Sequence, residues 1–465
     1  MRTAERLPGT ADLAYWSVIG LGALSAVVRP VVDGLGLPGL LRNADALLTP
    51  VAAAAVCLLA LARRHELSPA TTRVLLAFAA LVATTLMSWS VVGPRSVLSL
   101  GLAFSSLLLL PCALVLVVLA SARGRRPHVV PLLRALVLLQ LVVGFAQYVG
   151  YDVAQGAPFR ADLVDGTTSH NFWPAFALPA SAALLLLDRS RTRWLWPASV
   201  IVLAVYAEAK AALLVFLPVL AVVAVIVLVG SLRSRPRPVL TGDLLTRAAL
   251  VTATVAVLGV GLWFTPSVQG TWQVLIGHTR DAIALGDGTA APAPDVVTLR
   301  ESIPVLVDAV TSSPQAFLRG LGPGNSVSHA AEVLLQRAPA GGSDAGPVAE
   351  RLLSSEGGLQ FQDAQSSVLG VWGDLGLLGA LCYLAVLLLA AHALAGGRAR
   401  WRSHGATSFL VVTIGAGILA GGLPLDWPEQ GSIVLPLMLP LLALAHVQAA
   451  RARSEPPAAL VRVTA

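Results

Sequence analysis

The sequence predicts an all-α, polytopic membrane protein with about twelve transmembrane helices and one long, partly helical extracytoplasmic loop between helices 9 and 10. Of its 465 residues, 56% are hydrophobic and only 12% are charged, about half the charged fraction of a typical soluble chain. The apolar residues come in runs long enough to cross a hydrocarbon core, which takes about 20 residues of helix. The arginines lie in short clusters between these runs, which is typical of helices oriented by cytoplasmic positive charge.

The apolar runs divide the chain into membrane parts on either side of one long loop. The expected spans are 13–28, 45–62, 73–92, 97–120, 131–150, 173–187, 194–207, 211–231, 248–264, 366–391, 406–423 and 431–449. The expected units are an N-terminal membrane domain at 1–264, a loop or cap at 265–365, C-terminal membrane helices at 366–450 and a tail at 451–465. An even number of spans puts both termini on the same side of the membrane.

Counting the basic residues orients the chain. With the N-terminus in the cytoplasm, the cytoplasmic segments hold 22 of the 32 basic residues, and every short cytoplasmic connection is basic. The expected location is therefore the cytoplasmic (inner) membrane, with both termini in the cytoplasm and the lipid bilayer as a partner. The net charge of +7 is explained by these clusters, so no nucleic-acid partner is expected.

Residues typical of metal or cofactor chemistry are missing from the sequence. Cys57, Cys112 and Cys382 all fall inside apolar runs without metal-ligand spacing, and we interpret them as small core residues. There is no His-Glu-x-x-His motif for zinc and no Asp-x-Asp motif for a metal-bound nucleotide sugar. No metal and no cofactor are predicted.

The long loop carries an amphipathic helix. Apolar residues recur at helical spacing, while Arg300, Glu301 and Asp308 face elsewhere; the apolar positions are Leu299, Ile303, Leu306, Val307 and Val310. Pro304 fits near the first turn or at a kink. A second helical piece is expected around 330–336. These elements favour a partly helical cap over a disordered insertion, because the apolar stripe has a face to bury.

A glycine-rich stretch follows this helix, with the sequence Arg319-Gly320-Leu321-Gly322-Pro323-Gly324-Asn325-Ser326. Closely spaced glycines let backbone N–H groups approach a ligand, and such nests bind anions. The alternative is a tight turn without a ligand. A nucleotide P-loop is excluded, because no Gly-Lys-Ser/Thr follows.

Two further polar groups are expected at the outer membrane surface. Arg160 precedes His170 and Asn171 at the entrance of a helix, where these residues either bind a sugar or headgroup or form part of an interfacial belt. Glu208 and Lys210 lie between two apolar runs, where charges are costly. They either pair with each other or present the Lys210 cation to a lipid phosphate.

Taken in order, these features resemble the O-antigen ligase and O-antigen polymerase-like membrane proteins, which are glycosyltransferases of the GT-C type. The resemblance covers most of the chain from about residue 130 onward. The most specific match is Arg300, Ser313-Pro314 and Gly320-Leu321-Gly322-Pro323-Gly324, similar to the family's Arg…Pro…Gly-x-Gly-x-Gly stretch. Looser matches are the entry at Asp165 to Asn171, the segment around Lys210, and Gly376-Leu377-Leu378-Gly379 at the opening of the helix after the loop.

The chain departs from the family at the proposed base. Where the family's ligases carry a histidine, this sequence has Gln365-Ser366, and glutamine does not act as a general base. Either the role of the histidine is not needed, or Asp363 or His329 supplies the base, or this chain carries out different chemistry. The departure favours polymerase over ligase.

The resemblance implies that the chain transfers or polymerises a polyprenyl-diphosphate-linked oligosaccharide onto a glycan or lipid acceptor. The implied substrate-binding residues are Lys210, Arg300, Arg319, Arg160, Gly320, Gly322, Gly324, His170 and Asn171. A transporter or flippase of envelope precursors and a non-catalytic envelope-assembly scaffold are the alternatives. A transporter should carry ionisable or broken-helix sites near the middle of the membrane.

Overall fold

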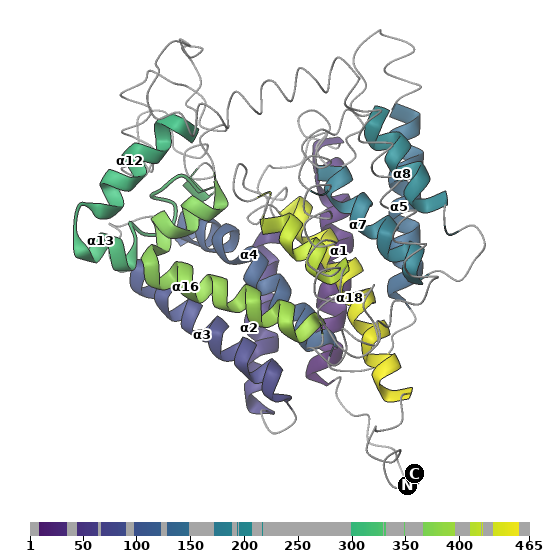
Figure 1. The fold of residues 1–465 in the computed structure, drawn as a ribbon, viewed down its shortest axis with the longest axis horizontal. Helices are drawn as coiled ribbons and strands as arrows, with labels where there is room; N and C mark the ends of the chain where they lie inside the picture. Colours follow the sequence, from purple (N-terminus) through teal and green to yellow (C-terminus); the bar gives the residue numbers. More distant parts are fainter. Residues whose placement is uncertain are drawn as a thin grey trace, which may run out of the picture.

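The computed structural model describes the chain in separate segments. They cover residues 9–34, 44–63, 67–89, 97–121, 128–147, 172–187, 193, 195–206, 216, 299–328, 330–331, 348, 366–395, 410–419, 421 and 431–454. Within these segments every regular element is a helix and no strand occurs, so the predicted all-α class is confirmed for the described residues (Figure 1).

The helices follow the expected spans closely in the first half of the chain. They are α1 (Thr10–Gly34), α2 (Ala44–Ala62), α3 (Pro69–Trp89), α4 (Val97–Ser121), α5 (Val129–Gln147), α7 (Phe172–Leu187) and α8 (Leu195–Tyr206). In the second half they are α12 (Leu299–Thr311), α13 (Pro314–Arg319), α16 (Ser367–Ala395) and α18 (Gly431–Ser454). Residues Leu410–Leu419 form a further apolar helix.

Four described helices are long and apolar enough to cross a membrane: Ala44–Ala62, Pro69–Trp89, Ala103–Ser121 and Ser367–Ala395. Five shorter apolar helices accompany them within the described segments. The membrane class is therefore supported, whereas the full set of twelve spans is not. The expected spans 211–231 and 248–264 lie outside the described residues, except at Phe216.

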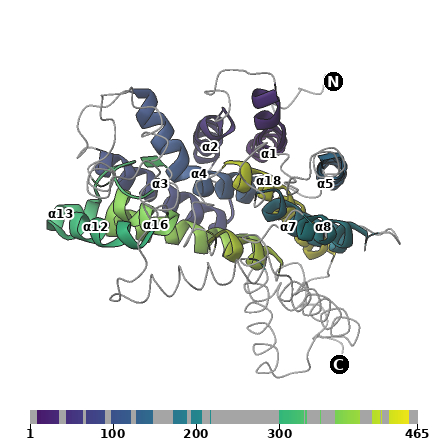
Figure 2. The same ribbon diagram turned by 90° about the horizontal axis from the view of Figure 1, so that it is seen from above.

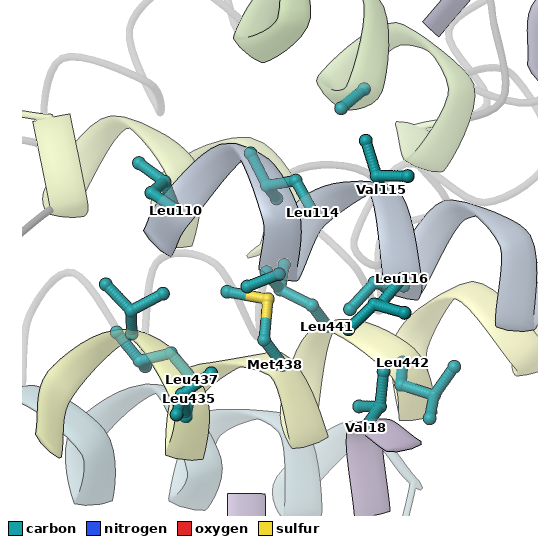
Figure 3. Packing of buried hydrophobic residues seen from close by; sticks show 14 of the residues in the cluster. Val18, Leu110, Leu114, Val115, Leu116, Leu435, Leu437, Met438, Leu441 and Leu442 are labelled. Carbon is teal, nitrogen blue, oxygen red and sulfur yellow. The ribbon is translucent and has the colours of Figure 1, made fainter. Parts of the chain in front are cut away.

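Helix α4 forms the centre of the bundle. In its most apolar window, 94% of the residues are buried within the protein, against 28% for α2 and 33% each for α3 and α16. A helix that is hydrophobic on all sides belongs in an interior, and α4 packs against α1, α2, α16 and α18. Figure 3 shows Leu116 of α4 beside Leu441 and Leu442 of α18.

The outer helices expose apolar side chains instead. On α16 the exposed large apolar residues are Val368, Leu378, Leu381, Leu384 and Leu388, and on α2 they are Leu48, Val51, Leu58, Leu59 and Leu61. Large exposed apolar surfaces are rare on water-soluble monomers. On a helix of membrane-spanning length, such a surface is expected to face lipid.

Helix ends that should share one side of the membrane meet in the structure. Near the start of α1, the Tyr15 ring lies 5.7 Å from the His446 ring of α18, and Trp16 stacks on His128 at 5.9 Å. The His446 Nε2 atom lies 3.4 Å from the carbonyl oxygen of Ala120, at the end of α4. The predicted alternation of spans places all four ends on the cytoplasmic side, and their meeting agrees with that alternation.

Candidate functional site

The amphipathic helix of the long loop is α12, as the sequence predicts. Its fully buried residues, Ser302, Leu306 and Val310, recur every four positions, and Leu306 and Val310 pack against Val327, Ala331 and Val348. The prediction for Val307 is wrong, because its side chain is 37% exposed. Among the described residues, the buried stripe is therefore narrower than the sequence pattern suggests.

Helix α13 is a short helix with a defined cap at each end. The Ser313 side chain accepts a hydrogen bond from the Ala316 N–H at 3.1 Å, and Pro314 occupies the first helical turn, where a proline costs no hydrogen bond. Gly320 ends the helix with φ +80°, and its N–H donates to the Ala316 carbonyl at 2.8 Å. Figures 1 and 2 both show α12 and α13 beside the start of α16.

The glycine-rich segment that follows lies directly against α16. The Leu321 N–H donates to the Gly373 carbonyl at 2.8 Å, and the Gly322 N–H donates to the Asp374 carbonyl at 3.0 Å. The same Asp374 carbonyl also accepts the Ser88 hydroxyl of α3 at 2.5 Å. Gly322 and Gly324 both have positive φ, a conformation that glycine adopts without a steric penalty. The glycines therefore shape a turn that joins the cap to two membrane helices.

The carboxylate of Asp374 is the centre of this junction. Its Oδ2 atom accepts the Gly324 N–H at 2.8 Å and the Ser328 hydroxyl at 2.7 Å. Its Oδ1 atom accepts the N–H groups of Asn325 at 3.0 Å and Ser326 at 2.8 Å. The side chain is fully buried. A buried carboxylate is costly unless hydrogen-bonded, and four donors satisfy this one. We call residues 320–328 with Asp374 the clasp.

A strip of glycines on α16 makes room for the clasp. Gly370, Gly373 and Gly376 follow one another at three-residue spacing. A Cβ atom at Gly370 would lie 2.7 Å from the Ser328 Cα, and one at Gly373 would lie 2.7 Å from the Leu306 Cδ1. Gly376 has φ +66° and interrupts α16 with a kink. The sequence placed Gly376 at the opening of the helix, but α16 begins at Ser367 and Gly376 opens only its second part.

The predicted ligand for the glycine segment needs correction. The N–H groups of residues 320, 321, 322 and 324 all donate to protein acceptors, and position 323 is a proline. The anion that the nest binds is the side chain of Asp374. Gly320, Gly322 and Gly324 therefore act as structural residues of the clasp, and their N–H groups do not face a ligand in this structure.

The structure describes few of the other predicted site residues. Arg319 ends α13 and is exposed, and Arg300 lies in the first turn of α12. The candidate bases Asp363 and His329 and the family position Gln365 lie outside the described residues. So do Arg160, His170, Asn171 and Lys210.

Sequence reasoning missed Asp374. It is an isolated acidic residue in an apolar run, between Gly373 and Leu375. Ionisable residues inside membrane segments are rare and usually paired, so this signal was available. Because both carboxylate oxygens of Asp374 are buried and hydrogen-bonded, the residue is placed to hold the clasp together and not to take a proton from a substrate.

The sequence matches no protein-family model and no curated protein. The resemblance to O-antigen ligase and polymerase-like proteins thus stays a prediction that rests on the quoted motifs. The descriptions of the fold and of the clasp depend only on the helices and hydrogen bonds of the structure.

Proposed function

We propose that the chain is a membrane glycosyltransferase that extends a polyprenyl-diphosphate-linked glycan on the outer face of the cytoplasmic membrane, as a polymerase more than as a ligase. One observation carries the proposal. The glycine-rich segment, the most specific part of the resemblance, is fixed to the membrane helices α3 and α16, with the exposed Arg319 immediately before it. A cation held there is suitably placed for a diphosphate at the membrane surface.

The chemistry suits a site made of cations. An acceptor hydroxyl attacks the anomeric carbon of the donor glycan, the bond from that carbon to the diphosphate oxygen breaks, and the polyprenyl diphosphate leaves with the bonding electrons. The charge that develops on the diphosphate is stabilised by fixed positive groups. In this proposal Lys210, Arg300, Arg319 and Arg160 supply that charge, and His170 and Asn171 contact the sugar or the headgroup.

The acceptor proton must leave late in the reaction. Asp363 or His329 takes it in this proposal, because Gln365 is unable to. Asp374 is excluded from the role by its burial and its four hydrogen bonds.

A second candidate function is a non-catalytic scaffold in envelope assembly. It is favoured by the internal bonding of the glycine segment, whose N–H groups at 320–322 and 324 are all used to hold the protein together. A scaffold needs a rigid cap but no cationic site. Replacing Arg319 with alanine separates the two candidates, since it removes the cation and leaves the clasp residues in place.

Deleting the gene and analysing surface polysaccharide on gels tests the proposal. A polymerase predicts loss of the long-chain ladder while a single repeat is retained. Complementation with the Arg319→Ala variant should restore little of the ladder. A complete ladder from that variant at normal protein level would contradict a role for Arg319 and favour the scaffold. Lipid-linked polymer that accumulates without reaching its acceptor would identify a ligase.

A further inference from the structure

Helix α13 presents two apolar side chains and a cation in succession. Phe317 is 38% exposed and Leu318 is 43% exposed, and Arg319 is also exposed. None of the six residues of α13 is buried. Exposed phenylalanine and leucine next to arginine are typical of segments that lie at the surface of a lipid bilayer.

The contacts of α13 fix its height along the bundle. The helix packs against both α3 and α16, and a Cβ atom at Gly376 would lie 2.6 Å from the carbonyl carbon of Leu318. On the other side, Ser88 of α3 is bonded to the Asp374 carbonyl, which also receives the Gly322 N–H. Helix α13 therefore lies level with the last turn of α3.

The last turn of α3 marks the edge of the lipid-facing surface. Leu86, Met87 and Trp89 are all more than 40% exposed there, and Trp89 meets the Phe104 ring edge-on at 5.8 Å. Tryptophan is enriched at the boundary between hydrocarbon and headgroups. Exposed leucines continue this surface along α16, beginning at Leu378. The apolar residues of α13 thus extend a surface that already faces lipid.

We propose that α13 is seated in the outer leaflet of the bilayer, with Phe317 and Leu318 among acyl chains and Arg319 against lipid phosphates. The clasp holds α13 at this depth, because Gly320 ends the helix directly beside Asp374 and Gly376. Long cationic side chains near such a boundary extend toward the headgroups. Arg319 belongs to both proposals, but the seat of Phe317 and Leu318 needs no glycan chemistry, so measurements at these two positions test it separately from the proposed function.

Cysteine labelling of the full chain in vesicles tests the seat. In a background where Cys57, Cys112 and Cys382 are alanine, single variants carry cysteine at Phe317, Leu318 or Asp308. The vesicles contain phosphatidylcholine and phosphatidylglycerol, and the reagent is a membrane-impermeant maleimide. Phe317→Cys and Leu318→Cys should react about tenfold more slowly than Asp308→Cys, because a side chain buried in hydrocarbon is rarely open to water.

Asp308 is the matched control, since it is exposed on the neighbouring helix α12. Equal rates at Leu318 and Asp308 would overturn the seat. A fluorophore attached at position 318 or at position 308 provides a second measurement. Lipids that carry a nitroxide near the headgroup should quench the fluorescence at position 318 and leave the fluorescence at position 308 unquenched. Slow labelling without such quenching would also overturn the proposal, since it would show that protein and not lipid shields positions 317 and 318.

The phosphate contact is tested by changing the charge at position 319. Arg319→Glu should reduce quenching at position 318 in vesicles rich in phosphatidylglycerol, whereas Arg319→Lys should preserve it. Unchanged quenching in Arg319→Glu would contradict the contact between Arg319 and lipid phosphates.

Discussion

Asp374 is the residue on which the junction between cap and membrane helices depends most. Its carboxylate accepts four hydrogen bonds from residues 324–328. The donating residues are themselves buried, so a change of Asp374 would leave these donors without their partner in the interior. An ionised carboxylate can hold four donors in this way because both of its oxygens accept hydrogen bonds and neither donates one. An amide in the same place would turn an NH₂ group toward donors.

The first prediction is therefore for Asp374→Asn. We expect the free energy of unfolding in detergent to fall by about 3 kcal/mol, because hydrogen bonds to a charged group are lost and buried donors are left unsatisfied. Limited proteolysis within 320–328 should become faster. Asp308→Asn, at an exposed position, should change stability by about 0.5 kcal/mol or less. Equal stability of the two variants would contradict the role assigned to the carboxylate.

The second prediction concerns the glycine strip. Gly373→Ala places a Cβ atom 2.5 Å from the Ser326 Cβ, so overpacking should cost roughly 1–3 kcal/mol. Gly101→Ala in α4 is the control, since nothing lies within 4 Å of its Cβ, and it should stabilise the helix by about 0.5–1 kcal/mol. Thermal unfolding of both variants measures the difference, and opposite signs are expected.

At the scale of elements, burial separates α4 from the helices around it. Leu116 of α4 is 1% exposed and Leu381 of α16 is 55% exposed, although both are leucines in membrane helices. We expect Leu116→Ala to destabilise by about 2–5 kcal/mol through the cavity it leaves. Leu381→Ala should change stability by about 0.5 kcal/mol or less. A similar loss in both variants would show that α4 is not interior.

The sequence was a good guide to elements whose residues repeat at a fixed period. The apolar stripe of 299–310 identified α12, and the long apolar runs identified α2, α3, α4 and α16. The sequence did not predict contacts between residues that lie far apart along the chain. Nothing near residues 320–324 in the sequence indicates that their anion lies on α16, and Val307 fits the apolar stripe although its side chain is exposed.

Gly376 illustrates the same limit. Its spacing from Gly379 was visible, but its role was not, because positive φ and the approach of Gly320 are properties of the packed pair. Asp374 was the one tertiary feature that the sequence could have revealed, since an acid in an apolar run requires a partner.

At the scale of the whole molecule, helix ends with the same predicted side gather in two places. Tyr15, Ala120, His128 and His446 meet at one, and the ends of α3 and α13 with the start of α16 meet at the other. The arginine count predicts that the first lies on the cytoplasmic side and the second on the outer side.

This assignment leads to a prediction about Lys210. It is the only lysine and is expected at the outer face, between two spans. Lys210→Ala should abolish glycan extension while leaving membrane insertion intact, because a cation is lost from the proposed diphosphate site. Lys210→Arg should retain part of the activity. Gel analysis of surface polysaccharide in complemented deletion cells measures both, and full-length product from Lys210→Ala would contradict the assignment.

The most direct measurement is reconstitution of the purified chain in vesicles with a polyprenyl-diphosphate-linked oligosaccharide. We predict longer lipid-linked glycans and release of free polyprenyl diphosphate, both strongly reduced by Arg319→Ala. Movement of the intact lipid-linked oligosaccharide across the bilayer, without chain extension or release of polyprenyl diphosphate, would contradict the proposed function.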